Sequence, residues 1–273
     1  MRNVRRLLFL SVWFLFKAEI CFGLVGSLLV DARSAGMGGC AVATSPWVNP
    51  SLYVFVPDES RCATLQYLNR YGVKEMSTYA GMVNFSNRLL PVGGVVSRYG
   101  FRAYSETMCA LHVYRALSPY ISLGVRADYF CIHQAGVESN KSVFTADVLI
   151  STQPVQNLLI AVGAFNPVAS SYQAGGRRIR LPMVLMVGMD YRVTPSFRLT
   201  GQVEKDFSQP FVGRVGMEYQ PLEALCVRLG MQAKPFVPGV GVGVRLAAFS
   251  LDLACTRHPV LGFSTSCGLS FHY

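Results

Sequence analysis

The chain has 273 residues, of which 51% are hydrophobic and 15% charged, with a formal net charge of +10. An average soluble domain carries about 25% charged residues, yet beyond the N-terminus no run of about 18 uncharged apolar residues predicts a spanning helix. High apolarity without such a helix leaves two classes, a membrane β-barrel and an unusually apolar soluble β-protein. Nucleic-acid binding is set aside, because the basic residues are scattered rather than gathered on one face or stripe.

The first 23 residues have the organisation of a secretory signal peptide. Three arginines among the first six residues precede an apolar run over residues 7–16, which is too short to span a bilayer. Cys21 and Gly23 are small residues at positions −3 and −1 of a cleavage after Gly23. We therefore expect export of the chain and removal of residues 1–23.

Residues 24–58 do not alternate like a strand. Gly36, Gly38 and Gly39 lie among small side chains, and Asn49-Pro50 follows them. Glycine and proline at this density predict a compact irregular segment or short helices. Glycine would let this backbone pack closely against a neighbouring wall, and the Asn49 side chain would cap a turn.

From residue 59 to residue 273, large apolar residues alternate with small or polar ones. A period of two predicts β-strands with two different faces. About fourteen strands of roughly ten residues follow, the length that a tilted strand needs to cross a bilayer. They are predicted near 62–69, 76–85, 90–98, 102–115, 119–131, 143–152, 157–165, 182–192, 196–205, 211–219, 223–232, 239–246, 248–255 and 261–273.

The last predicted strand, residues 261–273, ends on the aromatic Tyr273 with no polar tail after it. A final strand that ends on an aromatic residue is typical of bacterial outer-membrane barrels. If the C-terminus is periplasmic, every second connection should be a short turn and the others external loops. Residues 132–142 and 165–181 are the long connections and fall in the external set. The predicted short turns lie around 86–88, 117–119, 154–156, 193–195, 220–222 and 247–248.

A closed barrel follows from hydrogen bonding, because every backbone N–H and C=O within lipid must pair internally. The apolar face would then meet lipid, and the polar face a lumen. Two interpretations of the charged lumen residues stay open, a polar conduction path and a network of ion pairs that fills the lumen, and the mixed signs favour the network. The predicted lumen residues are Arg126, Asp128, Asp147, Asp190, Arg198, Glu204, Arg214, Glu218, Arg228, Arg245, Asp252 and His272.

No motif in the sequence predicts an enzyme, a metal site or a cofactor. The four histidines lack a Gly-x-Ser-x-Gly elbow that would favour a hydrolase. Seven cysteines remain after residues 1–23, an odd number with no CxxC pair, so neither a zinc site nor a full disulfide framework is expected.

Several segments resemble a known family. Residues 32–39 (ARSAGMGG), followed by Asn49-Pro50-Ser51, resemble the N-terminal segment of PorV/PorQ-like outer-membrane proteins, relatives of the FadL long-chain fatty-acid transporters. Shorter matches include residues 188–191 (GMDY) and 216–219 (GMEY). The resemblance implies a fourteen-stranded barrel with residues 24–58 as a plug, in which Gly36, Gly38, Gly39, Asn49 and Pro50 would have plug or gating roles. Ser51 departs from the alanine that is usual in the family.

Two functions are therefore carried forward. The first is a non-enzymatic outer-membrane barrel that serves type IX-like surface secretion or transports a hydrophobic molecule, with secretion proteins or a long-chain ligand as partners. The second is a soluble exported barrel that binds an apolar ligand, which would need its apolar set inward and its charged set outward. Arg177, Arg178 and Arg180, in the longest predicted external loop, would bind lipopolysaccharide phosphates or form a solvated basic loop.

Overall fold

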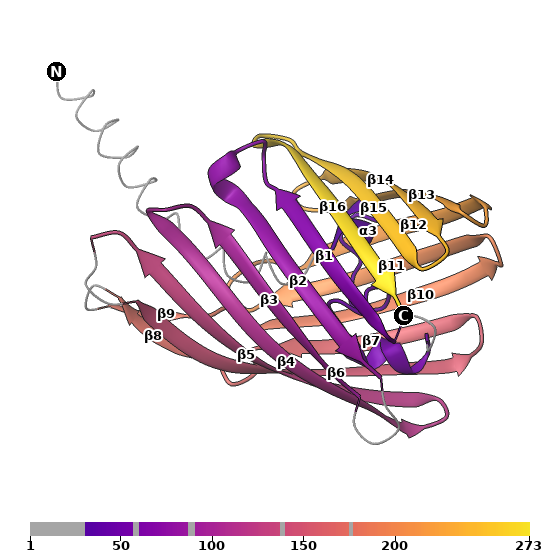
Figure 1. Cartoon of the computed structure of the whole chain (residues 1–273), viewed down its shortest axis with the longest axis horizontal. Helices are drawn as coiled ribbons and strands as arrows, with labels where there is room; N and C mark the ends of the chain where they lie inside the picture. Colours follow the sequence, from indigo (N-terminus) through magenta and orange to yellow (C-terminus); the bar gives the residue numbers. More distant parts are fainter. Residues whose placement is uncertain (1–30, 57–59, 87–90, 137–139, 175–176) are drawn as a thin grey trace.

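The computed structural model describes residues 31–56, 60–86, 91–136, 140–174 and 177–273. The predicted signal peptide, residues 1–23, lies outside the described residues, so its cleavage stays a prediction. Most of the described chain forms antiparallel strands that close into a barrel (Figure 1).

The barrel contains fourteen strands, and consecutive neighbours pair antiparallel around it. It closes where β1 pairs with β16, with Cys62 opposite His272 and Asn69 opposite Thr265. The barrel strands are β1 (Cys62–Asn69), β2 (Ser77–Phe85), β3 (Val92–Gly100), β4 (Tyr104–Ser118), β5 (Ile121–Gln134), β6 (Lys141–Val155), β7 (Leu158–Phe165), β10 (Val184–Thr194), β11 (Phe197–Asp206), β12 (Val212–Leu222), β13 (Leu225–Gln232), β14 (Val237–Leu246), β15 (Phe249–His258) and β16 (Gly262–His272).

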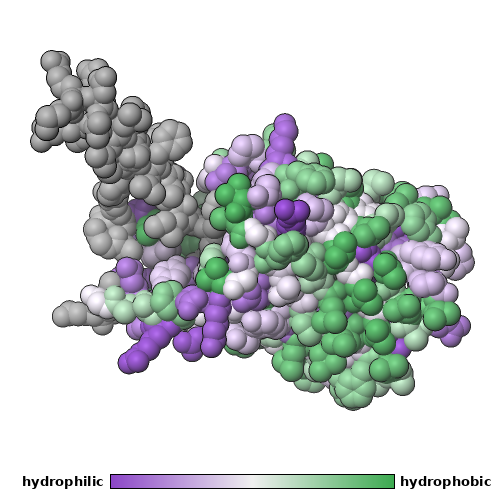
Figure 2. All heavy atoms as spheres, turned by 90° about the horizontal axis from the view of Figure 1, so that it is seen from above, coloured by the Kyte–Doolittle hydropathy of each residue, from purple (hydrophilic) through white to green (hydrophobic). Residues whose placement is uncertain are grey.

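The prediction of an all-β barrel of about fourteen strands is confirmed, and each predicted strand coincides with one of these. The strands could be predicted because outward apolar residues alternate with inward small or polar ones along each strand. In β14, Val240 and Val242 are exposed on the outer side, whereas Gly239 and Gly241 are buried on the inner side. Figure 2 shows hydrophobic side chains gathered over the barrel wall.

The apolar set faces outward along the strands. Val125 is 38% exposed, whereas the neighbouring Arg126 is 1% exposed. This is the opposite of what a soluble barrel with an apolar interior needs. Separately, no helix among the described residues is long and apolar enough to cross a membrane.

The connections follow the predicted sides, but most have shifted bounds. The turns predicted at 117–119, 154–156 and 193–195 lie at 119–120, 156–157 and 195–196. The predicted loop 132–142 shortens to 135–140, because β5 and β6 continue to pair as far as Ile132 opposite Lys141. The predicted loop 165–181 contains a hairpin of β8 (Ser171–Ala174) and β9 (Arg177–Arg180), which packs against β6. The turn predicted at 220–222 lies at 223–224, because β12 extends to Leu222. The turn predicted at 86–88 lies mostly outside the described residues.

Residues 31–56, called here the inner segment, lie inside the barrel (Figure 1). The segment contains helix α3 (Ala32–Gly36) and the 3₁₀ helix η1 (Pro50–Val54). Helix α3 begins with a capping box, in which Asp31 and Ser34 each accept the other's backbone N–H at 3.2 Å. Helix α3 contacts β13–β16 and β1, and η1 contacts β4–β6, so the segment reaches across the barrel interior.

Candidate functional site

Glycines allow the inner segment to touch the barrel wall backbone to backbone. A Cβ added at Gly230 of β13 would lie 2.2 Å from the carbonyl carbon of Met37. Gly38 has φ +69°, and a Cβ there would lie 2.4 Å from the backbone nitrogen of Met231. A Cβ on Gly36 would lie 2.9 Å from the Cα of Gly241. The segment is therefore docked on β13 and β14 at distances that only glycine permits.

Gly39 also has a left-handed conformation, with φ +83°. A Cβ there would lie 2.4 Å from a guanidinium nitrogen of Arg214. Cys40, the next residue, is buried, and burial raises the pKa of its thiol to about 12.

Asn49 fastens the inner segment to itself and to the opposite wall. Its amide nitrogen donates to the carbonyl of Val42 at 2.8 Å and to Ser151 Oγ of β6 at 2.9 Å. Its amide oxygen accepts the Ser51 N–H at 3.1 Å and the Ser51 hydroxyl at 2.6 Å. Pro50 occupies the start of η1, where its missing N–H costs nothing. These contacts include the predicted turn cap and add a tie to β6.

Sequence reasoning missed three side chains that hold the segment. Gln202 of β11 accepts the backbone N–H groups of Ala41 and Val42, at 2.8 and 3.0 Å. Ser122 of β5 donates to the carbonyl of Ser51 at 2.9 Å. Gln66 of β1 is the third, and it accepts the N–H of Ala32 at 3.2 Å. The alternation in the sequence places these three side chains on the inward face. It does not indicate their partners, which lie 34–161 residues away in the chain.

One buried ion cluster lies between β5 and β6. Arg126 pairs with Asp128 at 3.0 Å and with Asp147 at 2.6 Å. Asp147 also accepts the backbone N–H of Asn166 at 2.9 Å. The guanidinium carbon of Arg126 lies 5.6 Å from the centroid of the Phe165 ring. This cluster therefore joins the barrel wall to the base of the connection that carries β8 and β9.

A second ion cluster joins the inner segment to β12. The carboxylate of Glu218 lies 3.1 Å from Arg33 of the segment, 2.7 Å from Arg228 and 3.8 Å from Arg198. Arg228 also pairs with Asp252 at 2.6 Å. Three arginines thus share one carboxylate, and the Arg33–Glu218 pair bridges the inner segment and the wall.

The other predicted lumen residues form isolated ion pairs, or no ion pair with a described residue. Arg198 reaches Asp190 at 3.4 Å, and Arg214 reaches Glu204 at 3.0 Å. His272 lies near the end of the chain, with its Nε2 3.5 Å from Ser250 Oγ. Arg245 is exposed and makes no ion pair with any residue that the structure describes.

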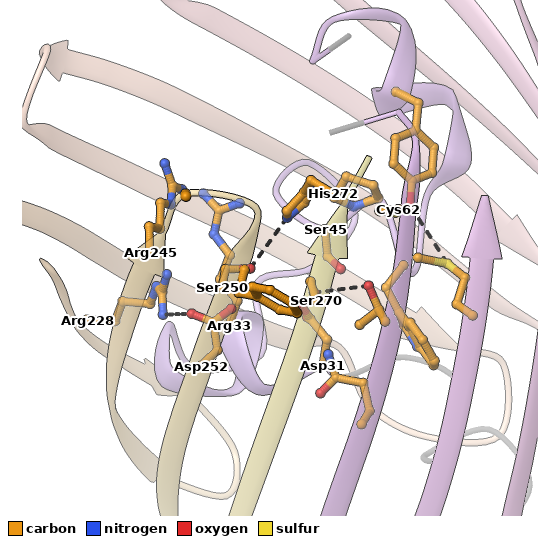
Figure 3. A pocket seen from close by; sticks show the side chains of 18 residues that line it. Asp31, Arg33, Ser45, Cys62, Arg228, Arg245, Ser250, Asp252, Ser270 and His272 are labelled. Carbon is orange, nitrogen blue, oxygen red and sulfur yellow. Dashed lines mark hydrogen bonds and ion pairs between the residues drawn. The ribbon is translucent and has the colours of Figure 1, made fainter. Parts of the chain in front are cut away.

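A cavity of about 380 Å³ remains beside the inner segment, at the barrel end that carries the C-terminus (Figure 3). The segment contributes Trp47 and Tyr53, and strands β14–β16 contribute Arg245, Ser250 and His272. A second, apolar groove of about 740 Å³ lies on the outside of β1–β3. Thr64, Met82 and Phe249 line both spaces.

The outer groove exists because small residues occupy outward positions. Ala63, Gly81 and Gly94 line it on three adjacent strands, beside the larger Leu65 and Phe85.

In the described part of the chain, no three His, Cys, Asp or Glu side chains gather as a metal site would require.

Fold and interior together define a class of protein: a closed fourteen-stranded barrel of the outer-membrane type, partly filled by its own N-terminal segment. Solved structures with this fold follow, each at 10% sequence identity. "TodX deltaS2S3 mutant monoaromatic hydrocarbon channel" has a TM-score of 0.62, over 89% of this chain and 99% of its own. "CymD monoaromatic hydrocarbon channel" has a TM-score of 0.59, over 94% and 99%. A Pseudomonas aeruginosa FadL homologue has a TM-score of 0.55, over 89% and 96%.

At this identity the likeness shows a shared fold. No protein-family model matches the chain, and no curated protein matches it either.

Proposed function

We propose that this chain is an outer-membrane transport protein that carries a small hydrophobic molecule through its barrel. Residues 59–273 would form the spanning barrel, residues 24–58 the plug, and residues 1–23 a removed signal peptide. The outward apolar residues and the closed hydrogen-bond ladder support placement in a bilayer. Two solved barrels of this fold are described as monoaromatic hydrocarbon channels, and this similarity supports transport rather than catalysis.

One observation carries the proposal. The cavity beside the inner segment and the apolar groove on the outer face share Thr64, Met82 and Phe249 as lining residues. A hydrophobic molecule in the interior therefore lies close to an apolar surface that faces lipid. Such a molecule would change from one space to the other where β1 and β2 pair, with Thr64 opposite Met82, so this pairing would have to open.

The inner segment would act as a fixed plug. The glycine contacts at Gly36, Gly38 and Gly230 and the ties of Asn49 hold it on both sides of the interior. Passage would run beside the segment rather than through the space that it occupies. With the C-terminus in the periplasm, the cavity opens toward the periplasm and the β8–β9 hairpin lies outside the cell.

Secretion has less support than transport. The resemblance of residues 32–39 to PorV/PorQ-like proteins stays a prediction, and the structural likenesses reported above are to hydrocarbon and FadL-type channels. Lipopolysaccharide contact through Arg178 and Arg180, both exposed on β9, stays part of the proposal.

The test uses Gram-negative cells with an intact lipopolysaccharide leaflet, because phospholipid bilayers alone are permeable to small hydrocarbons. Uptake of radiolabelled toluene is compared between cells that produce the protein and cells with an empty vector. We expect faster uptake with the protein, and unchanged uptake of a sugar of similar size. Equal toluene uptake, in cells whose outer membrane contains the heat-modifiable barrel, would contradict transport of this kind.

A further inference from the structure

The cavity at the C-terminal end of the barrel has a polar side on strands β14–β16, and the inner segment adds both aromatic and polar groups to its lining. Arg245, Ser250 and His272 approach it from the neighbouring strands β14, β15 and β16 (Figure 3). The inner segment contributes the aromatic rings of Trp47 and Tyr53 and also Asp31, whose carboxylate accepts the N–H of Ser34 at 3.2 Å. A neutral hydrocarbon would use only the aromatic rings.

The polar side holds one guanidinium that has no carboxylate partner among the described residues. Two of the three arginines that line the cavity are committed, since Arg33 pairs with Glu218, and Arg228 pairs with Glu218 and Asp252. Arg245 has no carboxylate within 4.0 Å among the described residues. His272 also lines the cavity, and its Nε2 lies 3.5 Å from Ser250 Oγ. A guanidinium without a carboxylate partner at one end of a cavity is complementary to an oxyanion.

We propose that this cavity binds a small organic acid, whose carboxylate pairs with Arg245 and whose apolar body lies against Trp47 and Tyr53. The proposal rests on the proposed transport function only for the identity of the cargo, because binding can be measured without transport. Arg245 would form paired N–H···O bonds with the carboxylate, and His272 and Ser250 would complete the polar side. A volume of about 380 Å³ limits the ligand to a single ring or a short aliphatic chain.

Trp47 gives a direct reporter. The sequence contains two tryptophans, and the other, Trp13, lies in the predicted signal peptide. In the processed protein, purified from outer membranes in detergent, intrinsic fluorescence therefore comes from the cavity wall. Titrations with 4-ethylbenzoate and with ethylbenzene compare two ligands that have the same ring and differ by the carboxylate.

We expect 4-ethylbenzoate to bind at least tenfold more tightly than ethylbenzene. The Arg245→Gln variant should lose at least tenfold in affinity for the acid and less than twofold for the hydrocarbon. Arg245→Lys, which keeps the charge, should recover part of the loss. Arg115→Gln is the matched control, because Arg115 is exposed on β4 and does not line the cavity.

Equal affinity for the two ligands would overturn the proposal, and so would an Arg245→Gln variant that binds the acid normally. Heat-modifiable migration on gels verifies that each variant is folded. Failure of toluene uptake in cells leaves these titrations unaffected, so the transport function and the acid site fail separately.

Discussion

The contact between Gly230 and Met37 predicts that one added side chain will undock the inner segment. A Cβ at Gly230 would lie 2.2 Å from the carbonyl carbon of Met37 and 2.3 Å from the backbone nitrogen of Gly38. Ordinary carbon contacts begin at about 3.4 Å, so Gly230→Val must separate segment and wall by more than about 1 Å. Both partners are backbone and no rotamer change can relieve the clash. Overpacking of this kind costs about 1–3 kcal/mol, enough to populate an undocked segment.

Cys40 reports the undocking. Burial raises the pKa of its thiol to about 12, so at pH 8 only about 1 in 10⁴ molecules carries the thiolate, against about a quarter for an exposed thiol of pKa about 8.5. In the wild type, iodoacetamide should modify Cys40 slowly, and the rate should rise about tenfold per pH unit as the thiolate fraction grows. In Gly230→Val, the rate at pH 8 should rise by up to about 10³-fold.

The modified fraction is measured by mass spectrometry on the peptide that contains Cys40, because six further cysteines are free in the described chain. Gly213→Val is the matched control, since a Cβ at Gly213 of β12 meets no atom within 4 Å. Rapid modification of Cys40 in the wild type would refute the docked segment. Slow modification in a folded Gly230→Val barrel would refute the steric argument.

Three further outcomes are expected. Glu218→Gln removes the carboxylate that three arginines share, so the barrel should lose about 3–5 kcal/mol and change gel mobility at a lower temperature; an unchanged transition temperature would contradict the bridging role. Asn49→Ala should loosen the inner segment by about 1–3 kcal/mol and speed its proteolysis in the folded barrel; equal proteolysis rates would argue against the tie to β6. Gly94→Phe should fill the outer groove and slow toluene uptake several-fold, whereas Gly213→Phe, outside the groove, should not. Equal uptake by the Gly94→Phe variant and the wild type would show that the groove has no role in transport.

The barrel was predictable from the sequence because alternation reports the two faces of each strand directly. The Val-Gly repeat of β14 is the clearest case, with its valines outward and its glycines inward. The same alternation identified Arg126 and Glu218 as inward residues before any partner was known. Strand ends were less accurate, because pairing continues through polar residues where the pattern fades, as at Ile132 opposite Lys141.

The arrangement inside the barrel could not be predicted in the same way. Which wall glycines meet Met37, and that Gln202 accepts the N–H groups of Ala41 and Val42, depends on where the segment crosses the interior. No local pattern encodes such contacts between residues far apart in the chain. The β8–β9 hairpin was missed for another reason: its strands are four residues each, too short for a period of two to be recognised.

The contacts of the inner segment join parts of the chain that are synthesised at very different times. The inner segment precedes the barrel in the chain, and its η1 contacts strands β4–β6, which are synthesised soon afterwards. Its α3 contacts β13–β16, and the Arg33–Glu218 pair spans 185 residues. Contacts at such separation form late in folding, because the intervening chain must first lose its freedom. The Arg33–Glu218 pair therefore forms only after most of the barrel has been synthesised, whereas the η1 contacts with β4–β6 need far less of the chain.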